Sequence, residues 1–414
     1  MQSRTIRLLV SFFLVTAAGL PASALADERA QLNRIVFVGD SITAGFQNFS
    51  LFDSASVPGM PPGGQSHGLA AMIARQAGAS ITLPLISYPG IPPALAFSGG
   101  TIVREAGIGA RENPAQQTTV LAVPGFTLAD MLAHPFPGSP MENPIDALAD
   151  SILGTPAGGI RGCGPIPLPF ENPHEVVSEV VCAAALHPST IVIDAGNNDA
   201  LQTLTFGTPP TNAAVFGAEF DAIMATLVLG HRAAVVIGNI PDVTAIPFLI
   251  PAAAFEAQCG VSPGADFVVP DITNPSLTTF NICTTYATRS AAQIAAAHNA
   301  VLAYNATIAA EAKRFGASVV DVYGILNNLT KNGYTAANYH LTTAPFPCGG
   351  LFSLDAVHPT NTGYAILANA FIAVLSQKYK ANIPLVDVNA TAQADPLFPP
   401  NVLGPAVSTT CPGQ

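Results

Sequence analysis

Five short apolar segments rich in β-branched residues recur along the chain, separated by stretches of helix-favouring composition. The segments span residues 35–38, 119–123, 190–195, 233–237 and 318–322. Near-continuous apolar runs of this length are typical of strands buried on both faces of a parallel sheet. The expected helices span residues 66–76, 176–186, 213–229, 288–315 and 360–378. This alternation predicts an α/β fold in which helices cover both faces of one sheet, a three-layer α/β/α sandwich.

The first residues have the pattern of a secretory signal peptide. Arg4 and Arg7 precede an apolar core at residues 8–20, and a small-residue cleavage site follows at residues 24–26. We therefore expect residues 1–26 to be removed and the mature protein to be secreted, to the extracellular space or the periplasm. No later segment is apolar over the roughly 18 residues that a transmembrane helix needs, so no transmembrane segment is predicted.

The mature chain, residues 27–414, is long for one α/β core. Four segments that leave the ends of the expected strands are rich in proline, glycine and phenylalanine. We interpret them as loop insertions in a single domain, near residues 51–113, 133–173, 240–283 and 332–350. The tail from residue 382 carries several prolines and is expected to lie extended along the surface.

The charge pattern does not favour an electrostatic partner. Only 10% of the residues are charged, and the net charge is −11. Nucleic acid is bound largely through clusters of Lys and Arg at its phosphates, so it is not an expected partner. No Cys-x-x-Cys or His-x-x-x-His spacing indicates a metal site, and neither a metal nor another cofactor is expected.

The six cysteines of an exported chain favour disulfides, because the compartment outside the cytosol does not keep thiols reduced. Many pairings are possible in principle. Proximity in the sequence suggests three pairs: Cys163 with Cys182, Cys259 with Cys283, and Cys348 with Cys411. The last pair would tie down the tail.

A serine follows the first expected strand directly, in the sequence Gly39-Asp40-Ser41. Open α/β sheets expose reactive groups at the carboxyl ends of their strands, but a serine hydroxyl needs a base to act as a nucleophile. His358 could supply that base, and Asp355 is near enough in the sequence to hold its other ring nitrogen. The two ends of the chain therefore predict one hydrolytic site, although each motif alone also fits an ordinary turn.

Two further positions suit the negatively charged intermediate of acyl transfer. Gly125 comes just after the expected strand 119–123, and its unhindered backbone N–H could turn toward the site. Asn198 follows the strand 190–195 and offers a side-chain donor, although such an asparagine is often only a helix cap. Together with the Ser41 N–H, these donors could meet the charge on the former carbonyl oxygen.

These residues resemble, in order, the four sequence blocks that define the GDSL family, also called the SGNH hydrolase superfamily. The blocks match at GDSI (39–42), at Gly125, at GNND (196–199) and at DAVHP (355–359), so the resemblance covers most of the mature chain. Ile42 replaces the leucine that gives the family its name. The fold that the resemblance implies is flavodoxin-like, with a five-stranded parallel sheet.

The resemblance also implies roles for the matching residues. Ser41 would be the nucleophile, His358 the general base and Asp355 the residue that orients it. Gly125 and Asn198 would complete the oxyanion hole with the Ser41 amide.

The implied activity is that of a secreted esterase or lipase acting on small-molecule or lipid carboxylic esters. An acyltransferase, a carbohydrate esterase and a noncatalytic binding protein are the alternatives on such a scaffold. The chain has no tryptophan, which argues against a stacking platform for sugar rings. Large apolar residues in and near the insertions suggest an acyl-binding wall, but they also suit simple packing: Phe46, Phe49, Phe52, Met60, Phe97, Phe126, Phe136, Phe170, Phe248 and Phe255.

Overall fold

The computed structural model describes residues 32–54, 63–135, 144–154, 176–229, 233–271 and 277–411. Several sequence-based predictions lie outside these residues. They are the signal peptide at 1–26, much of the insertion at 133–173, Cys163, Met60, Phe136 and Phe170.

A parallel sheet of four strands forms the centre of the fold. Its order is β1 (Ile35–Gly39), β6 (Thr190–Asp194), β7 (Ala234–Gly238) and β12 (Ser318–Val320). Ile35 pairs with Thr190, and every residue of β1 and β6 is buried, as the continuous apolar runs predict. The predicted α/β class is therefore confirmed.

The fifth expected strand, 119–123, is an extended segment and not a regular strand. It lies along the outer edge of β1, where Phe37 N–H donates to Thr119 O (3.0 Å) and Val123 N–H donates to Gly39 O (3.2 Å). On the outer edge of the segment, the Thr118 hydroxyl donates to Val120 O and accepts from Val120 N–H. These backbone groups are therefore bonded within the segment itself. The segment thus forms one isolated bridge to β1, and the predicted count of five strands is not confirmed.

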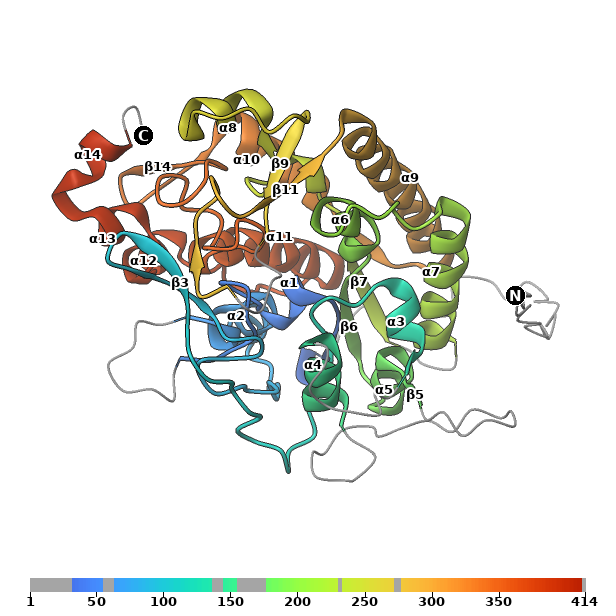
Figure 1. Cartoon of the computed structure of the whole chain (residues 1–414). Coiled ribbons are helices and arrows are strands. Elements are labelled where there is room, and N and C mark those ends of the chain that lie inside the picture. Colours follow the sequence, from blue (N-terminus) through green and yellow to red (C-terminus); the bar gives the residue numbers. More distant parts are fainter. Residues whose placement is uncertain are drawn as a thin grey trace, which may run out of the picture.

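Helices cover both faces of the sheet (Figure 1). On one face, α2 (Leu69–Ala77) packs against α11 (Asn361–Tyr379), which also contacts β7 and β12. On the other face lie α3 (Leu128–Leu132), α5 (Glu179–Ala185), α7 (Ala213–Val228) and α9 (Ala291–Phe315). The arrangement is the predicted three-layer sandwich.

Local signals set the ends of these helices. Ser290 and Gln293 form a capping box at the start of α9, and Gly316 ends it in the left-handed conformation. The helix expected at 176–186 begins later than predicted. Residues Val176–Val177 form the short strand β5, paired with β4 (His134–Pro135), and Ser178 caps α5.

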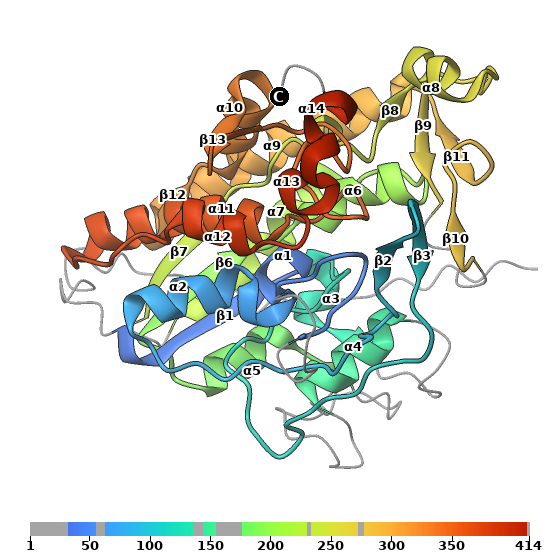
Figure 2. The same cartoon turned by 90° about the vertical axis from the view of Figure 1, so that its left-hand side faces the viewer.

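The segments that leave the strand ends contain small sheets and further helices. β2 (Leu95–Ser98), β3 (Thr101–Arg104) and β10 (Thr279–Phe280) form one sheet, and β8 (Ile250–Pro251), β9 (Phe267–Pro270) and β11 (Tyr286–Arg289) form another. Figure 2 shows these strands gathered at one edge of the molecule. A hairpin consists of β13 (Tyr334–Ala336) and β14 (Tyr339–Leu341). Further helices are α1 (Ser41–Ala44), α4 (Pro144–Leu153), α6 (Asn197–Thr205), α8 (Ala252–Cys259) and α10 (Val322–Asn332).

The prediction of an extended tail is wrong. The tail forms α12 (Val388–Ala394), α13 (Pro399–Leu403) and α14 (Val407–Thr410). Asp387 caps α12 by accepting from Ala390 N–H, and prolines occupy the first turn of α13, where their missing N–H groups have no helical partner to lose. The prolines that suggested an extended chain therefore start a helix.

Two disulfides join the pairs that sequence proximity suggested, Cys259 with Cys283 and Cys348 with Cys411. Cys182 is also disulfide-bonded, and its expected partner Cys163 is not among the described residues. Across the described part of the chain, no helix has the length and apolar character needed to cross a membrane.

Candidate active site

Ser41 lies where β1 turns into the short helix α1. Asp40 caps this helix, its carboxylate accepting from Ile42 N–H at 3.2 Å. Gly39 adopts φ of +144°, and a Cβ there would lie 1.9 Å from the Asp194 carbonyl oxygen at the end of β6. Only glycine therefore lets β1 approach β6 closely enough to place Ser41 at the carboxyl edge of the sheet.

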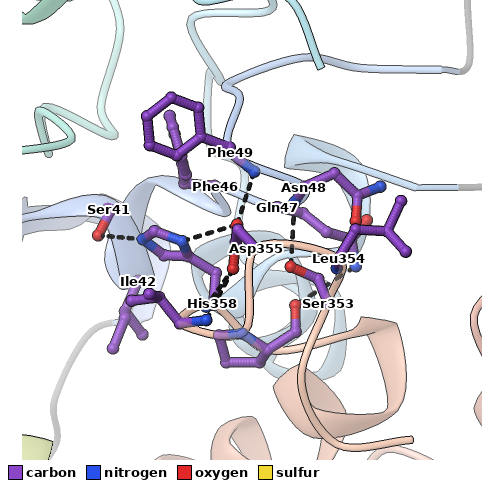
Figure 3. Close-up of polar contacts among 12 residues, drawn as sticks. Ser41, Ile42, Phe46, Gln47, Asn48, Phe49, Ser353, Leu354, Asp355 and His358 are labelled. Atoms are coloured by element: carbon purple, nitrogen blue, oxygen red, sulfur yellow. Dashed lines mark hydrogen bonds and ion pairs between the residues drawn. The ribbon is translucent and has the colours of Figure 1, made fainter. Parts of the chain in front are cut away.

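His358 and Asp355 lie on a compact turn before α11. Ser353 N–H donates to His358 O at 2.8 Å, and Ala356 N–H donates to Ser353 O at 3.0 Å. His358 Nδ1 lies 3.0 Å from Asp355 Oδ2, and His358 Nε2 lies 2.8 Å from Ser41 Oγ (Figure 3). The structure thus brings together the three residues that the two distant motifs predict.

The Asp355 carboxylate is buried and accepts several hydrogen bonds. Oδ1 accepts from the backbone N–H groups of Val357 and His358, both at 2.8 Å, and Oδ2 also accepts from Phe49 N–H at 2.6 Å. Burial alone would raise the pKa of Asp355, but the His358 charge and these hydrogen bonds hold it below its usual range. An ionised Asp355 fixes the proton of His358 on Nδ1, which leaves Nε2 as the acceptor facing Ser41.

A loop whose structural role the sequence did not indicate, residues 46–49, supports this turn. Asn48 and Phe49 both have positive φ, 54° and 57°, which directs their backbone N–H groups at the turn. Asn48 N–H donates to Ser353 Oγ at 3.0 Å, and the ring of Phe46 lies 4.7 Å from that of His358. Asparagine tolerates this conformation better than most residues, but no local pattern links residues 48 and 353.

The two predicted oxyanion donors lie at the same edge of the sheet. Gly125 follows the segment bonded to β1 and adopts φ of +90° in a turn closed by Phe126 N–H and Val123 O. Asn198 lies in the first turn of α6, and its Nδ2 donates to Phe126 O at 2.9 Å. A side-chain amide carries two N–H groups, so one remains for a ligand.

Comparison with known families identifies the chain. The family model of the GDSL-like lipase/acylhydrolase matches residues 35–371, which contain all four blocks. The chain belongs to this family. The resemblance noted in its motifs is therefore confirmed, and this GDSL-like protein is a carboxylic ester hydrolase.

Several solved structures are similar to this GDSL-like protein at low sequence identity. A lipase/acylhydrolase from Enterococcus faecalis is 12% identical, with 85% of this chain and 100% of that chain covered and a TM-score of 0.34. An acetylxylan esterase from Geobacillus stearothermophilus is 14% identical (84% and 95% covered, TM-score 0.36). A phospholipase A1 from Streptomyces albidoflavus is 12% identical (83% and 98% covered, TM-score 0.33). Comparison with curated proteins gives no match.

A histidine with no sequence context lies behind the Gly125 turn of this GDSL-like chain. His134 Nδ1 lies 3.2 Å from Asp130 Oδ1 on α3, and its Nε2 lies 2.9 Å from Asp146 Oδ1 on α4. Burial lowers the pKa of His134, but the bonds to both carboxylates outweigh it and raise the pKa. The centre of the Phe126 ring lies 4.8 Å from that of the His134 ring. The contacts of His134 with the two carboxylates therefore help to hold Phe126, and with it the Gly125 turn, in place.

Three buried acids lie beneath Ser41 in this GDSL-like fold: Asp40, Asp194 and Glu179. Asn197 Nδ2 donates to Asp40 Oδ2 at 2.9 Å and to Asp194 Oδ1 at 3.4 Å, and Glu179 Oε1 accepts from Gly39 N–H. Burial raises the pKa of all three acids, and their mutual repulsion raises those of Asp40 and Glu179 further. Glu179 was missed because an acid in the first turn of a helix is an ordinary sequence feature.

The described residues contain no group of three His, Cys, Asp or Glu side chains placed to hold a metal ion.

The raised pKa values beneath Ser41 predict how stability changes with pH. The folded protein holds protons on Asp40 and Asp194 more tightly than the unfolded chain, so the stability that these two acids contribute is lost as the pH rises from about 4 to about 7. Asp194→Asn removes one ionisable group and keeps an oxygen that accepts from Asn197. We expect it to raise the melting temperature by about 2 °C or more at about pH 8, and by less at about pH 5. Calorimetry of both proteins measures this, and a larger gain at the lower pH would contradict it.

Proposed function

We propose that the protein is a secreted serine esterase that hydrolyses carboxylic esters through an acyl-enzyme on Ser41. The observation that carries the proposal is the continuous chain of hydrogen bonds from Ser41 Oγ to His358 Nε2 (2.8 Å) and from His358 Nδ1 to Asp355 Oδ2 (3.0 Å). Distances in this range fit direct proton transfer between a nucleophile and its base. The alternative of a noncatalytic binding protein gives no reason for this alignment.

The reaction proceeds in two steps on this chain. As Ser41 Oγ bonds to the ester carbonyl carbon, its proton passes to His358 Nε2, and the C=O electrons move onto the oxygen. The intermediate then collapses, the bond to the alcohol oxygen breaks, and that oxygen leaves with the proton from His358. A water molecule next gives a proton to His358 as its oxygen bonds to the acyl carbon. The bond from the acyl carbon to Ser41 Oγ then breaks, His358 returns the proton to Ser41 Oγ, and the acid leaves. Asp355 stays ionised throughout and stabilises the imidazolium.

Three N–H donors would stabilise the oxyanion of each intermediate. The Ser41 amide is at the start of α1, where the first backbone N–H groups of a helix lack helical partners. Gly125 N–H and the second Nδ2–H of Asn198 come from the two neighbouring turns joined at Phe126. Fixed donors of this kind act without reorganisation when the charge forms.

The disulfide bonds of the chain support secretion. Disulfides such as Cys259–Cys283 and Cys348–Cys411 persist in oxidising compartments and are rare in the cytosol. The signal-peptide pattern of residues 1–26 agrees with this location.

Removal of the nucleophile tests the proposal directly. We expect Ser41→Ala to lower kcat on p-nitrophenyl acetate on the order of 10⁶-fold, because it removes the hydroxyl that is hydrogen-bonded to His358 Nε2. Ser80→Ala, at an exposed serine, is the matched control and should keep full activity. Stopped assays with purified, folded variants measure the rates. Turnover by Ser41→Ala near that of the natural protein would refute the mechanism.

Removal of an oxyanion donor should affect turnover more than binding. We expect Asn198→Ala to lower kcat by about 10²- to 10³-fold and to leave KM nearly unchanged, because the donor acts on charge that forms only in the transition state. Asn212→Ala, which removes an exposed helix cap, serves as the control for the loss of an asparagine. If Asn198→Ala instead raises KM and leaves kcat normal, Asn198 contributes only to binding of the substrate ground state, which contradicts its role as an oxyanion donor.

A further inference from the structure

An apolar cleft lies beside the Ser41–His358 pair. Its volume is about 90 Å³. Its walls come from α1, the loop after β7, α10, α11 and the turn before α11, and they include Ile42, Ile246, Leu326, Leu329, Val357 and Ile366. Among the phenylalanines that the sequence suggested for an acyl wall, those that the structure describes do not line it.

Residues next to the reacting groups in the sequence line the cleft. Ile42 directly follows Ser41, and Val357 and Pro359 flank His358 on both sides. In Figure 3, Ile42 lies on one side of the line from Ser41 to His358, and Phe46 and Phe49 lie on the other. The cleft that Ile42 lines therefore lies on the side of the Ser41–His358 pair away from Phe46 and Phe49.

The chemistry of the walls selects the part of the substrate that fits. Every side chain in the cleft is a hydrocarbon, and the wall residues Ile42, Leu329 and Ile366 are only partly buried. Such walls gain free energy when a hydrocarbon displaces water from them. The opposite side of the site differs, because the guanidinium of Arg104 lies 5.3 Å from the centre of the Phe49 ring. That side suits the polar alcohol portion of an ester.

We propose that this cleft binds the acyl chain of the substrate, and that the preferred substrates are esters of linear aliphatic acids. The proposal rests on the proposed function of Ser41. A methylene group is about as large as a water molecule, whose share of the liquid is roughly 30 Å³, so the cleft holds at least about three methylene groups. The acyl chain that fills the cleft is therefore clearly longer than acetyl.

The test uses p-nitrophenyl esters with acyl chains from acetyl to dodecanoyl. With one leaving group throughout, kcat/KM should rise about fourfold per methylene until the cleft is filled, and should then level off. Leu329→Trp fills the cleft from α10 and should lower the octanoyl-to-acetyl ratio of kcat/KM at least about tenfold. Leu329→Ala enlarges the cleft and should move the preference to longer chains.

The matched control is Asn327→Trp, which places the same side chain at an exposed position of α10 outside the cleft. It should keep the acyl-length profile of the natural protein. Should the tryptophan variant at Leu329 fail to fold, the alanine variant decides alone, because it requires no added volume. A second series of alkyl acetates varies the alcohol chain and should respond to neither Leu329 variant.

Each contrary result has a separate meaning. If Leu329→Trp and Leu329→Ala both keep the natural acyl-length profile while hydrolysis still requires Ser41, the cleft is not the acyl site and the proposed function stands. If the Leu329 variants change the alkyl acetate series instead, the cleft binds the alcohol and the proposal is overturned. If Ser41→Ala hydrolyses p-nitrophenyl acetate normally, the proposed function itself fails.

Discussion

The buried carboxylate of Asp355 is the group on which the geometry of the site depends. It accepts from Val357 and His358 within its own turn, from the His358 ring, and from Phe49, which lies 306 residues earlier in the chain. An unpaired charge at this depth would be strongly destabilising, so the carboxylate holds both segments in place. The 2.8 Å contact between Ser41 and His358 follows from that arrangement, because Phe49 and Ser41 belong to one continuous stretch after β1.

The acids beneath Ser41 show how the same residue type acquires the opposite property. Asp194 is as deeply buried as Asp355, but within the described part of the chain its carboxylate accepts only a long hydrogen bond, from Asn197. Burial therefore dominates, and the pKa rises, whereas the donors around Asp355 outweigh burial and the pKa falls. The acids on one side of the nucleophile therefore keep their protons to a higher pH, while Asp355 on the other side carries the negative charge that orients the base. The charge of His358 and the N–H donors around Asp355 make the difference.

The sequence was sufficient for the central strands and for the residues at their ends. Ser41, Gly125 and Asn198 each follow an apolar run directly, and His358 precedes a helix, so local patterns were enough to name them. The hydrogen bonds from Asn48 and Phe49 to the turn that carries Asp355 could not be predicted, because they join segments about three hundred residues apart. Glu179 was hidden for a similar reason, since its partner Gly39 lies 140 residues away. The helical tail was misjudged because proline suits both an extended chain and the first turn of a helix.

Covalent trapping of Ser41 tests the central claim most directly. The folded, oxidised protein is treated with a p-nitrophenyl alkylphosphonate, and the adduct is located by peptide mass spectrometry. The hydrogen-bonded chain Ser41–His358–Asp355 predicts one adduct, on the peptide that contains Ser41, and its loss in Ser41→Ala and His358→Ala. Ester hydrolysis that proceeds at its normal rate after treatment, or an adduct confined to another residue, would contradict the assignment of Ser41 as the nucleophile.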